Sequence, residues 1–257
     1  MKITLLGTGT SQGIPVIGCG CLVCTSTNPK DNRLRTSVLI ETPESNFLID
    51  CGPDFRQQML RENVQDVNAV LLTHDHQDHV AGMDELRSFI FKNKAPMPVF
   101  AENAVLERLK KMYHYAFAET PYPGAPSYAL HSIIPGELFI NGIEIVAIRL
   151  QHGNLSILGF RIKNFAYLTD VNFIPEESIA QLQNLDVLVI DALHHKTHHS
   201  HFNLTEALGA IKAISPEKAY LTHISHSMGL HHEVEKSLPE NVSVSYTHLT
   251  LPTIYSV

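Results

Sequence analysis

The stretch "LLTHDHQDH", residues 71–79, joins a short apolar run to four side chains of the types that bind metal ions. The apolar run predicts a buried strand that ends just before the first histidine. His74 and His76 lie two apart in the extended turn that follows, so both can point to one side and bind one ion. Asp78 and His79 fall on the next turn of the chain and can bind a second ion close by. A histidine-rich loop in solvent is the alternative, but chance rarely produces this spacing.

Three further polar residues directly follow apolar runs. His152 comes after "IVAIRLQ", Asp170 ends "FAYLTD" and His223 ends "KAYLTH". Polar residues are uncommon in buried positions, so one at the end of a buried strand is expected to have a specific role. A rigid sheet can hold a metal ligand at that position in a fixed direction. Each of the three, taken singly, is more often a structural residue. Taken with the first cluster, they predict a centre of two metal ions, which requires at least six ligands.

The ordered set H-x-H-x-D-H, then His, Asp and His, resembles the metallo-β-lactamase superfamily over nearly the whole chain. The resemblance implies an α/β fold, an αββα sandwich of two mixed β-sheets flanked by helices, with the metal site at the sheet edge. It also implies that Asp50, in "FLIDCGPDF", orients a ligating histidine. The implied ligands are His74, His76 and His152 for one ion, Asp78, His79 and His223 for the other, and Asp170 as the bridge.

Residue types distinguish the branches of this superfamily. Oxygen-reducing di-iron members carry Glu where this chain has His76. Drug-hydrolysing members usually lack the bridging carboxylate and place a Cys at the second metal. Here Asp170 is present, and Cys51 lies in a different motif. The complete set of seven ligands therefore resembles the phosphodiesterase and lactonase branches.

Three of the four cysteines lie within six residues, in "CGCLVC". Tetrahedral structural zinc takes four protein ligands, so three thiolates need a partner. The segment "THISH" offers two histidines, and the first, His223, is already assigned. This combination is similar to the cyclic ribose phosphate phosphodiesterases of bacterial phosphonate degradation. That resemblance implies a structural zinc that pins the N-terminal loop, bound by Cys19, Cys21, Cys24 and His226. Incidental thiols are the alternative.

The same resemblance implies the chemistry. A hydroxide that bridges two divalent ions, Zn²⁺ or Mn²⁺, would attack a small phosphodiester, with cyclic ribose phosphates the expected substrates. The stretch "HHKTHHSHFNLTEAL", residues 194–208, offers a group to protonate the leaving oxygen. His201, just before "NLTEAL", matches the histidine that this subgroup places near the phosphate as general acid or transition-state stabiliser. Asp78 and His201 are therefore the expected catalytic residues.

Other functions share part of this pattern. A tRNA 3′-end endonuclease has the same motif set but needs a flexible basic arm, and no such insertion lies between His79 and Asp170. The formal charge of −7 also disfavours nucleic acid as a partner. A lactonase gives the cysteines no role. A non-hydrolytic, metal-binding accessory protein of cofactor biosynthesis remains the alternative from another class, although such proteins have lost catalytic ligands that are all present here.

Composition sets the organisation of the chain. The 257 residues are 44% hydrophobic, and no linker, repeat or low-complexity stretch interrupts them, so we expect a single domain over 1–257. No apolar run approaches the ~20 residues of a membrane span. The apolar run near the first residue is also too short for the apolar region of a signal peptide. We therefore expect a cytoplasmic protein without a membrane partner, either a monomer or a homodimer. The segment "THLTLPTIYSV", 247–257, departs from the family pattern, and we expect it to be non-native.

Hydrophobic periodicity predicts two series of strands, each flanked by helices. The predicted strands are 2–7, 35–42, 46–52, 68–73, 97–101, 137–150, 158–162, 165–170, 186–191 and 218–223. The predicted helices are 53–63, 81–91, 103–117, 176–184 and 203–214.

Overall fold

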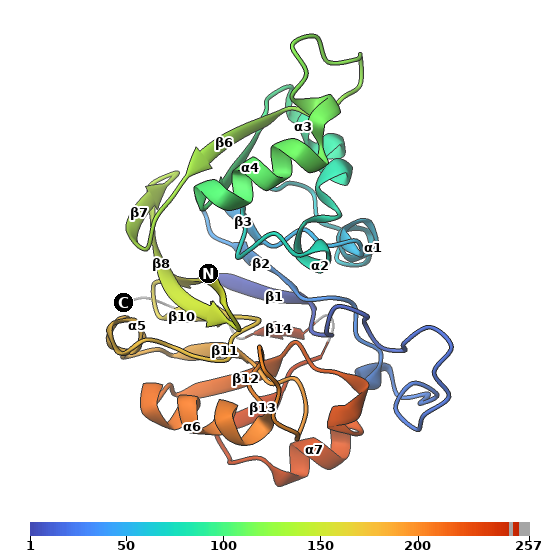
Figure 1. Ribbon diagram of the computed structural model, residues 1–257, viewed down its shortest axis with the longest axis vertical. Helices are drawn as coiled ribbons and strands as arrows, with labels where there is room; N and C mark the ends of the chain where they lie inside the picture. Colours follow the sequence, from blue (N-terminus) through green and yellow to red (C-terminus); the bar gives the residue numbers. More distant parts are fainter. Residues whose placement is uncertain (247–248, 252–257) are drawn as a thin grey trace.

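A computed structural model describes residues 1–246 and the backbone of 249–251. Two seven-stranded sheets pack face to face, with helices on their outer faces (Figure 1). The first sheet contains, in spatial order, β14 (Leu249–Leu251), β1 (Lys2–Gly7), β2 (Ser37–Glu41), β3 (Asn46–Ile49), β4 (Ala69–Leu71), β5 (Met97–Ala101) and β6 (Tyr128–Ser132). The second contains β13 (Val242–Val244), β12 (Lys218–Thr222), β11 (Val187–Asp191), β10 (Phe165–Leu168), β9 (Leu155–Ile162), β8 (Ile143–His152) and β7 (Gly136–Ile140).

The helices cover both outer faces, which confirms the predicted αββα sandwich. The α-helices are α1 (Phe55–Arg61), α2 (Gln77–Val80), α3 (Arg87–Asn93), α4 (Asn103–Met112), α5 (Glu176–Gln181), α6 (Leu204–Ile214) and α7 (His231–Ser237). Short 3-10 turns are η1 (Pro29–Asp31), η2 (Met83–Leu86), η3 (His114–Ala116) and η4 (His226–Met228). Among the described residues, none of the helices combines the length and the apolar character that crossing a membrane requires.

Three apolar layers hold the sandwich together. The central layer lies between the sheets and includes Phe47 of β3, Phe160 of β9 and Tyr167 of β10, all fully buried. A second layer lies under α1, α3 and α4, and a third under α5, α6 and α7. Strands β3, β4, β10 and β11 are apolar on both faces because each face is covered, as is usual for parallel strands.

Most predicted strands and helices are confirmed, with ends that differ by a few residues. The stretch predicted as strand over 137–150 forms two strands, β7 and β8, and the predicted helix 81–91 is a 3-10 turn, η2, followed by α3. The pattern missed β6, whose sequence "YALHS" is half-buried over its first three residues and exposed over its last two, and therefore shows no alternation. It also missed α7, "HHEVEKS", which has two histidines at its start and a single fully covered aliphatic side chain. Asp78 and His79 lie on the short helix α2 rather than on a plain turn.

The parallel strands place their carboxyl ends at one edge of the sandwich. Strand β3 pairs in parallel with β4, and β10, β11 and β12 also pair in parallel. The residues that follow β3, β4, β10 and β12 therefore meet at this edge, together with the last residue of β8. This arrangement places the predicted metal ligands within reach of one another.

The C-terminal segment is described in part. Residues Leu249–Leu251 form β14, which pairs antiparallel with β1 at the edge of the first sheet. A non-native tail was not expected to add such a strand, which counts against that expectation. Residues 247–248 and 252–257 lie outside the described part of the chain, so the origin of the segment stays a prediction.

Candidate metal centre

The seven predicted ligands of the dinuclear site come together at the edge of the sandwich. The ligand atoms of His74, His76 and His152 lie within 4.8 Å of one another. A second group meets the same criterion and consists of Asp78, His79, Asp170 and His223. Asp170 connects the groups, because its Oδ1 lies 3.2 Å from Nε2 of His223 and 4.0 Å from Nε2 of His152.

The backbone at the strand ends is strained where it presents these groups. Asp50, Asp170 and His223 have φ values of 62°, 55° and 55°, in the left-handed region that non-glycine residues seldom adopt. Each of them directly follows a buried strand or lies one residue beyond it. Such conformations cost about 1–3 kcal/mol each and tend to occur where function requires them.

Hydrogen bonds from Nδ1 fix the orientation of three ligating histidines. His79 donates from Nδ1 to Oδ2 of Asp50 at 2.7 Å, and His152 donates to the Ser200 carbonyl at 2.7 Å. His74 contacts Oγ1 of Thr73 at 2.9 Å, and that hydroxyl is itself bonded to Asp50. With Nδ1 engaged in this way, each ring turns the lone pair of Nε2 toward the centre.

The donor set fits divalent cations. The Nε2 atoms of His74, His79 and His223 are buried and make no hydrogen bond. Nε2 of His79 lies 3.1 Å from Asp170 and 3.2 Å from Asp78, so a lone pair faces two carboxylates. That arrangement is unfavourable without positive charge between the atoms. Imidazole and carboxylate donors together suit zinc or manganese.

The pKa values of two ligating histidines also show that positive charge is favourable at this site. Burial alone lowers the pKa of His79, but the carboxylates of Asp170, Asp78 and Asp50 outweigh it and hold that pKa well above its ordinary value. Burial likewise lowers the pKa of His223, and Asp170 and Asp78 reverse the effect and raise it to about 9. Without metal, protons therefore supply the charge that cations would supply, and metal binding must release them.

His201 and Asp191 form a pair beside this centre. Nδ1 of His201 donates to Oδ2 of Asp191 at 2.9 Å, and its Nε2 lies 3.9 Å from Oδ1 of Asp170. The His201 ring stacks on that of His223 with centroids 4.7 Å apart. Burial lowers the pKa of His201 to about 3 and raises that of Asp191 well above its ordinary value. His201 is therefore neutral near pH 7 until negative charge approaches its Nε2.

Sequence reasoning singled out His201 but missed Asp191. A signal was present, since Asp191 ends the apolar run "DVLVID" in the same way that Asp170 ends "FAYLTD". The neighbouring histidines have other surroundings: Nε2 of His195 contacts the Met228 carbonyl at 2.8 Å, and the His198 ring lies 5.2 Å from that of His201.

The three clustered cysteines also meet their predicted partner. The Sγ atoms of Cys19, Cys21 and Cys24 lie 3.4, 3.4 and 3.5 Å from Nδ1 of His226. Tetrahedral zinc with its usual bond lengths separates a sulfur and a nitrogen ligand by about 3.5 Å. The four side chains therefore fit a zinc ion in both type and spacing. The backbone amide of Cys24 lowers the pKa of the Cys21 thiol to about 6.

This site lies next to the dinuclear centre along the chain. His226 follows His223 by three residues, and the intervening Ile224 is fixed by the N-terminal loop. The amide of Ile224 donates to the Thr8 carbonyl at 2.9 Å, and the amide of Thr10 donates to the Ile224 carbonyl at 3.1 Å. The segment that carries His223 is thus held on both sides.

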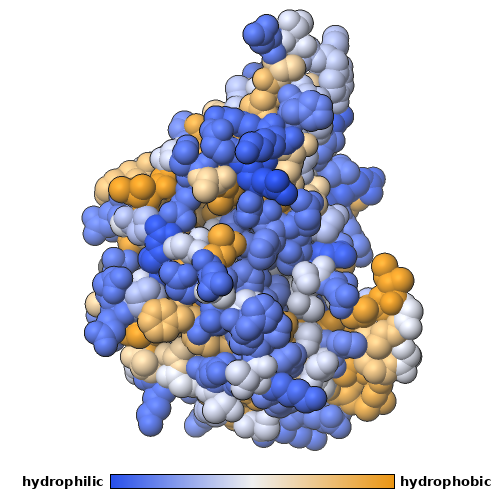
Figure 2. Space-filling view, in the orientation of Figure 1, coloured by the Kyte–Doolittle hydropathy of each residue, from blue (hydrophilic) through white to orange (hydrophobic). Residues whose placement is uncertain are grey.

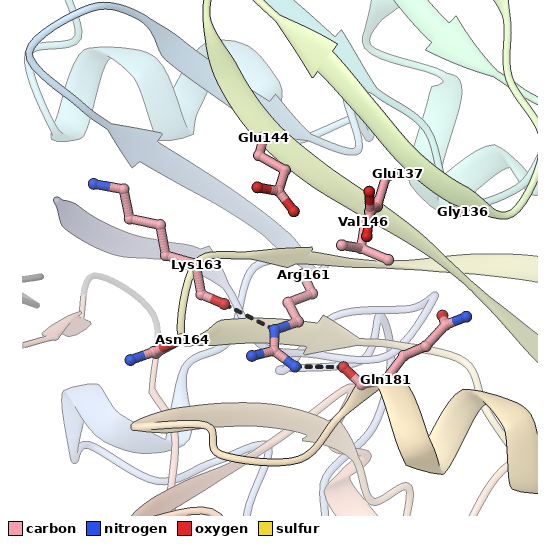
Figure 3. A pocket seen from close by; sticks show the side chains of 8 residues that line it. All are labelled: Gly136, Glu137, Glu144, Val146, Arg161, Lys163, Asn164 and Gln181. Carbon is pink, nitrogen blue, oxygen red and sulfur yellow. Dashed lines mark hydrogen bonds between the residues drawn. The ribbon is translucent and has the colours of Figure 1, made fainter.

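A large surface pocket lies elsewhere and contains none of these ligands (Figure 3). It has a volume of about 620 Å³ and lies over β7, β8 and β9 beside the end of α5. Arg161 projects into it and donates to the carbonyl oxygens of Lys163 and Gln181, while Glu137 and Glu144 lie opposite (Figure 3). Its arginine is occupied by backbone carbonyl oxygens, and its lining includes no member of the candidate metal-binding groups, so the candidate chemistry lies at the metal centre.

Comparison with known proteins agrees with the fold. A beta-lactamase superfamily domain matches residues 45–224. The chain belongs to the metallo-β-lactamase superfamily. A diphosphatase of the PhnP family, known from a crystal structure, is 35% identical, with a TM-score of 0.92 and 98% of each chain covered.

Two curated proteins that are similar to this chain have names that indicate functions other than diphosphate hydrolysis. The octanoyltransferase of Porphyromonas gingivalis is 40% identical over 252 residues, which are 97% of this chain and 51% of that protein. Coenzyme PQQ synthesis protein B of Ruegeria pomeroyi is 26% identical over 229 residues, with 74% of this chain and 72% of that protein covered. The chain thus spans about half the length of the first relative.

Proposed function

We propose that this metallo-β-lactamase-fold protein hydrolyses small phosphodiesters at a dinuclear centre of divalent ions, with cyclic ribose phosphates as the first substrates to test. The observation that carries the proposal is the position of Asp170, which belongs to the second group of ligands and also lies next to His152 of the first. The likeness to a PhnP-family diphosphatase at 35% identity supports a phosphorus-centred reaction.

Some residues of the metal centre would bind the ions, and others would transfer a proton. Bound Zn²⁺ or Mn²⁺ ions would lower the pKa of water and withdraw charge from the phosphoryl oxygens. Asp170 and Asp78 compensate the charge of those ions, and Asp50 holds the His79 ring in the ligating orientation. His76 is the exposed member of the first group, so the substrate approaches from its side.

His201 is placed to act on the leaving group. Its Nε2 faces Asp170 inside the site, and its Nδ1 is held by Asp191. When a phosphate anion approaches, its negative charge favours protonation of Nε2, and Asp191 stabilises the resulting imidazolium. His201 then gives its proton to the departing alkoxide, which is a strong base and leaves slowly without one.

A second candidate reaction is hydrolysis of a diphosphate, favoured by the activity of the 35% identical PhnP-family protein. The two reactions differ in the leaving group, because a departing phosphate is a much weaker base than an alkoxide. A His201→Ala variant should therefore lose about 10²–10³-fold in kcat on a cyclic ribose phosphate and much less on a dinucleoside diphosphate.

The names of the curated relatives support no other activity as strongly. About half of the octanoyltransferase lies outside the match, and acyl transfer has no candidate nucleophile among the residues of the metal centre. The PQQ synthesis relative keeps the accessory function as an alternative. Metal content separates the two, because the enzyme should bind about three ions per chain and an accessory protein with only the cysteine site about one.

The direct test is an assay of the metal-loaded protein on three substrates: bis(p-nitrophenyl) phosphate, a cyclic ribose phosphate and a dinucleoside diphosphate. Each is measured with Mn²⁺ and with Zn²⁺, beside an Asp170→Asn control. Turnover of the cyclic substrate that is lost in the control supports the proposal. Absence of turnover with every divalent metal contradicts it, and preference for the diphosphate selects the second candidate.

A further inference from the structure

The cysteine site lies in the most exposed part of the metal-binding machinery. The segment between β1 and β2 projects from one side of the sandwich (Figure 1). Ile17 and Leu22 in this segment are 99% and 69% exposed, and apolar surface is visible on the projection (Figure 2). Cys21 is exposed, whereas Cys51 in the body of the protein is fully buried.

The three thiols of the cysteine site also lie close to one another. The ligand atoms of the cysteine site all lie within 4.8 Å of one another. Cys21 and Cys24 form a C-x-x-C pair in a loop without regular structure, a spacing that closes readily to a disulfide. The loop therefore requires only small movements to bring the two sulfur atoms into bonding distance.

We propose that this cluster is an oxidative modification site, at which hydrogen peroxide converts Cys21 and Cys24 to a disulfide and releases the zinc ion. The Cys21 thiolate attacks one peroxide oxygen, forms a sulfenic acid and expels hydroxide. The Cys24 thiolate then attacks that sulfur, forms the S–S bond and expels a second hydroxide. Two protons convert the hydroxides to water, so the sulfur atoms lose two electrons and the peroxide gains them.

The loss of two thiolates leaves the zinc ion with Cys19 and His226 alone, which is too few ligands to retain it. His226 then loses its tie to the loop, three residues after His223. The backbone bonds between Ile224 and the N-terminal loop remain, so the fold persists while the position of His223 becomes less fixed. The dinuclear centre has no thiol ligand, so its own ions are not the target of peroxide.

The test treats the metal-loaded protein with hydrogen peroxide and follows zinc release with a chromophoric chelator. We expect one of about three ions per chain to be released, and peptide mapping to show a Cys21–Cys24 bond. Turnover should fall about tenfold, in line with the loss of groups that support a ligand, and should return with dithiothreitol and added zinc. The zinc and mapping readouts need no substrate, so they stand even if the proposed activity fails.

Matched variants separate this site from other oxidation. A Cys51→Ser variant should respond as the natural chain does, because that thiol is buried. In a variant with both Cys19→Ser and Cys24→Ser, which removes the two neighbouring thiols, sulfenic acid at Cys21 should persist and react with dimedone. Zinc that stays bound under peroxide, a disulfide mapped to other cysteines, or zinc release without a disulfide would each overturn the proposal. Unchanged turnover after complete zinc release would overturn its effect on the active site.

Discussion

The dinuclear centre and the cysteine site share one short segment of chain but are built in opposite ways. His79, Asp170 and His223 are 0–2% exposed and lie on a short helix or just beyond the ends of strands. The thiols of the cysteine site are half-buried or exposed and lie in a projecting loop. The first site is therefore held by the fold around it, whereas the second would depend on bonds to a bound metal ion for its rigidity.

This difference indicates what each site is for. Buried ligands held at strained strand ends keep a fixed geometry for chemistry, and their electrostatics demand cations. The loop site has no such support and contributes by joining distant parts of the chain, residues 19–24 and the segment after β12. This contrast between the two sites is wrong if the buried site keeps its activity after a ligand is removed. It is also wrong if removal of the loop site changes neither stability nor activity.

The largest expected effect is that of Asp170→Asn, which removes the carboxylate between the two ion positions. We expect kcat to fall by about 10³-fold or more, and the content of the two catalytic ions to drop while the cysteine-bound zinc stays. Steady-state kinetics and elemental analysis measure both. Retention of near-normal activity would show that Asp170 does not connect the two ions.

A smaller loss is expected from Asp50→Asn, because Asp50 touches His79 and Thr73 rather than an ion. We expect a 10–100-fold loss in metal affinity or activity. Glu144→Gln, an exposed carboxylate in the distant pocket, is the matched control and should have no effect. An effect of equal size in the control would mean that general charge, not orientation of the ring, is responsible.

Metal affinity should depend steeply on pH. The raised pKa values of His79 and His223, the latter about 9, mean that both are protonated in the metal-free protein near neutrality. Each proton must leave before the ion binds, so affinity should rise about tenfold per pH unit for each proton released, up to about pH 9. Competition titrations at several pH values measure the slope. A flat profile would contradict the electrostatics described for the centre.

The smallest effect is expected from Cys21→Ser. It should remove the cysteine-bound zinc and lower Tm by about 5 °C, while the two catalytic ions remain when metal is supplied in excess. Turnover should fall about tenfold. Differential scanning calorimetry and elemental analysis provide the readouts. Loss of all three ions would show that the two sites form a single unit.

The fold and the seven ligands were predicted from the resemblance of the ordered set of motifs to the metallo-β-lactamase superfamily, and three members of that set lie at the ends of apolar runs. A His or Asp at the end of an apolar run, as at His152, Asp170 and His223, can be recognised as a candidate ligand from the local sequence, without knowledge of which strands pair. Asp191 ends a similar run but was missed, since its role depends on which strand lies beside it. The pairing of β10 with β11, which brings Asp191 to His201, is a long-range contact that no local pattern contains.

Anomalous diffraction from crystals loaded with Mn²⁺ and Zn²⁺ tests the central claim most directly. The account predicts two peaks on either side of Asp170, one beside His74 and one beside His223, and a separate zinc peak among the three thiols. A single peak at the sheet edge, or none in contact with Asp170, would contradict a dinuclear centre in this protein.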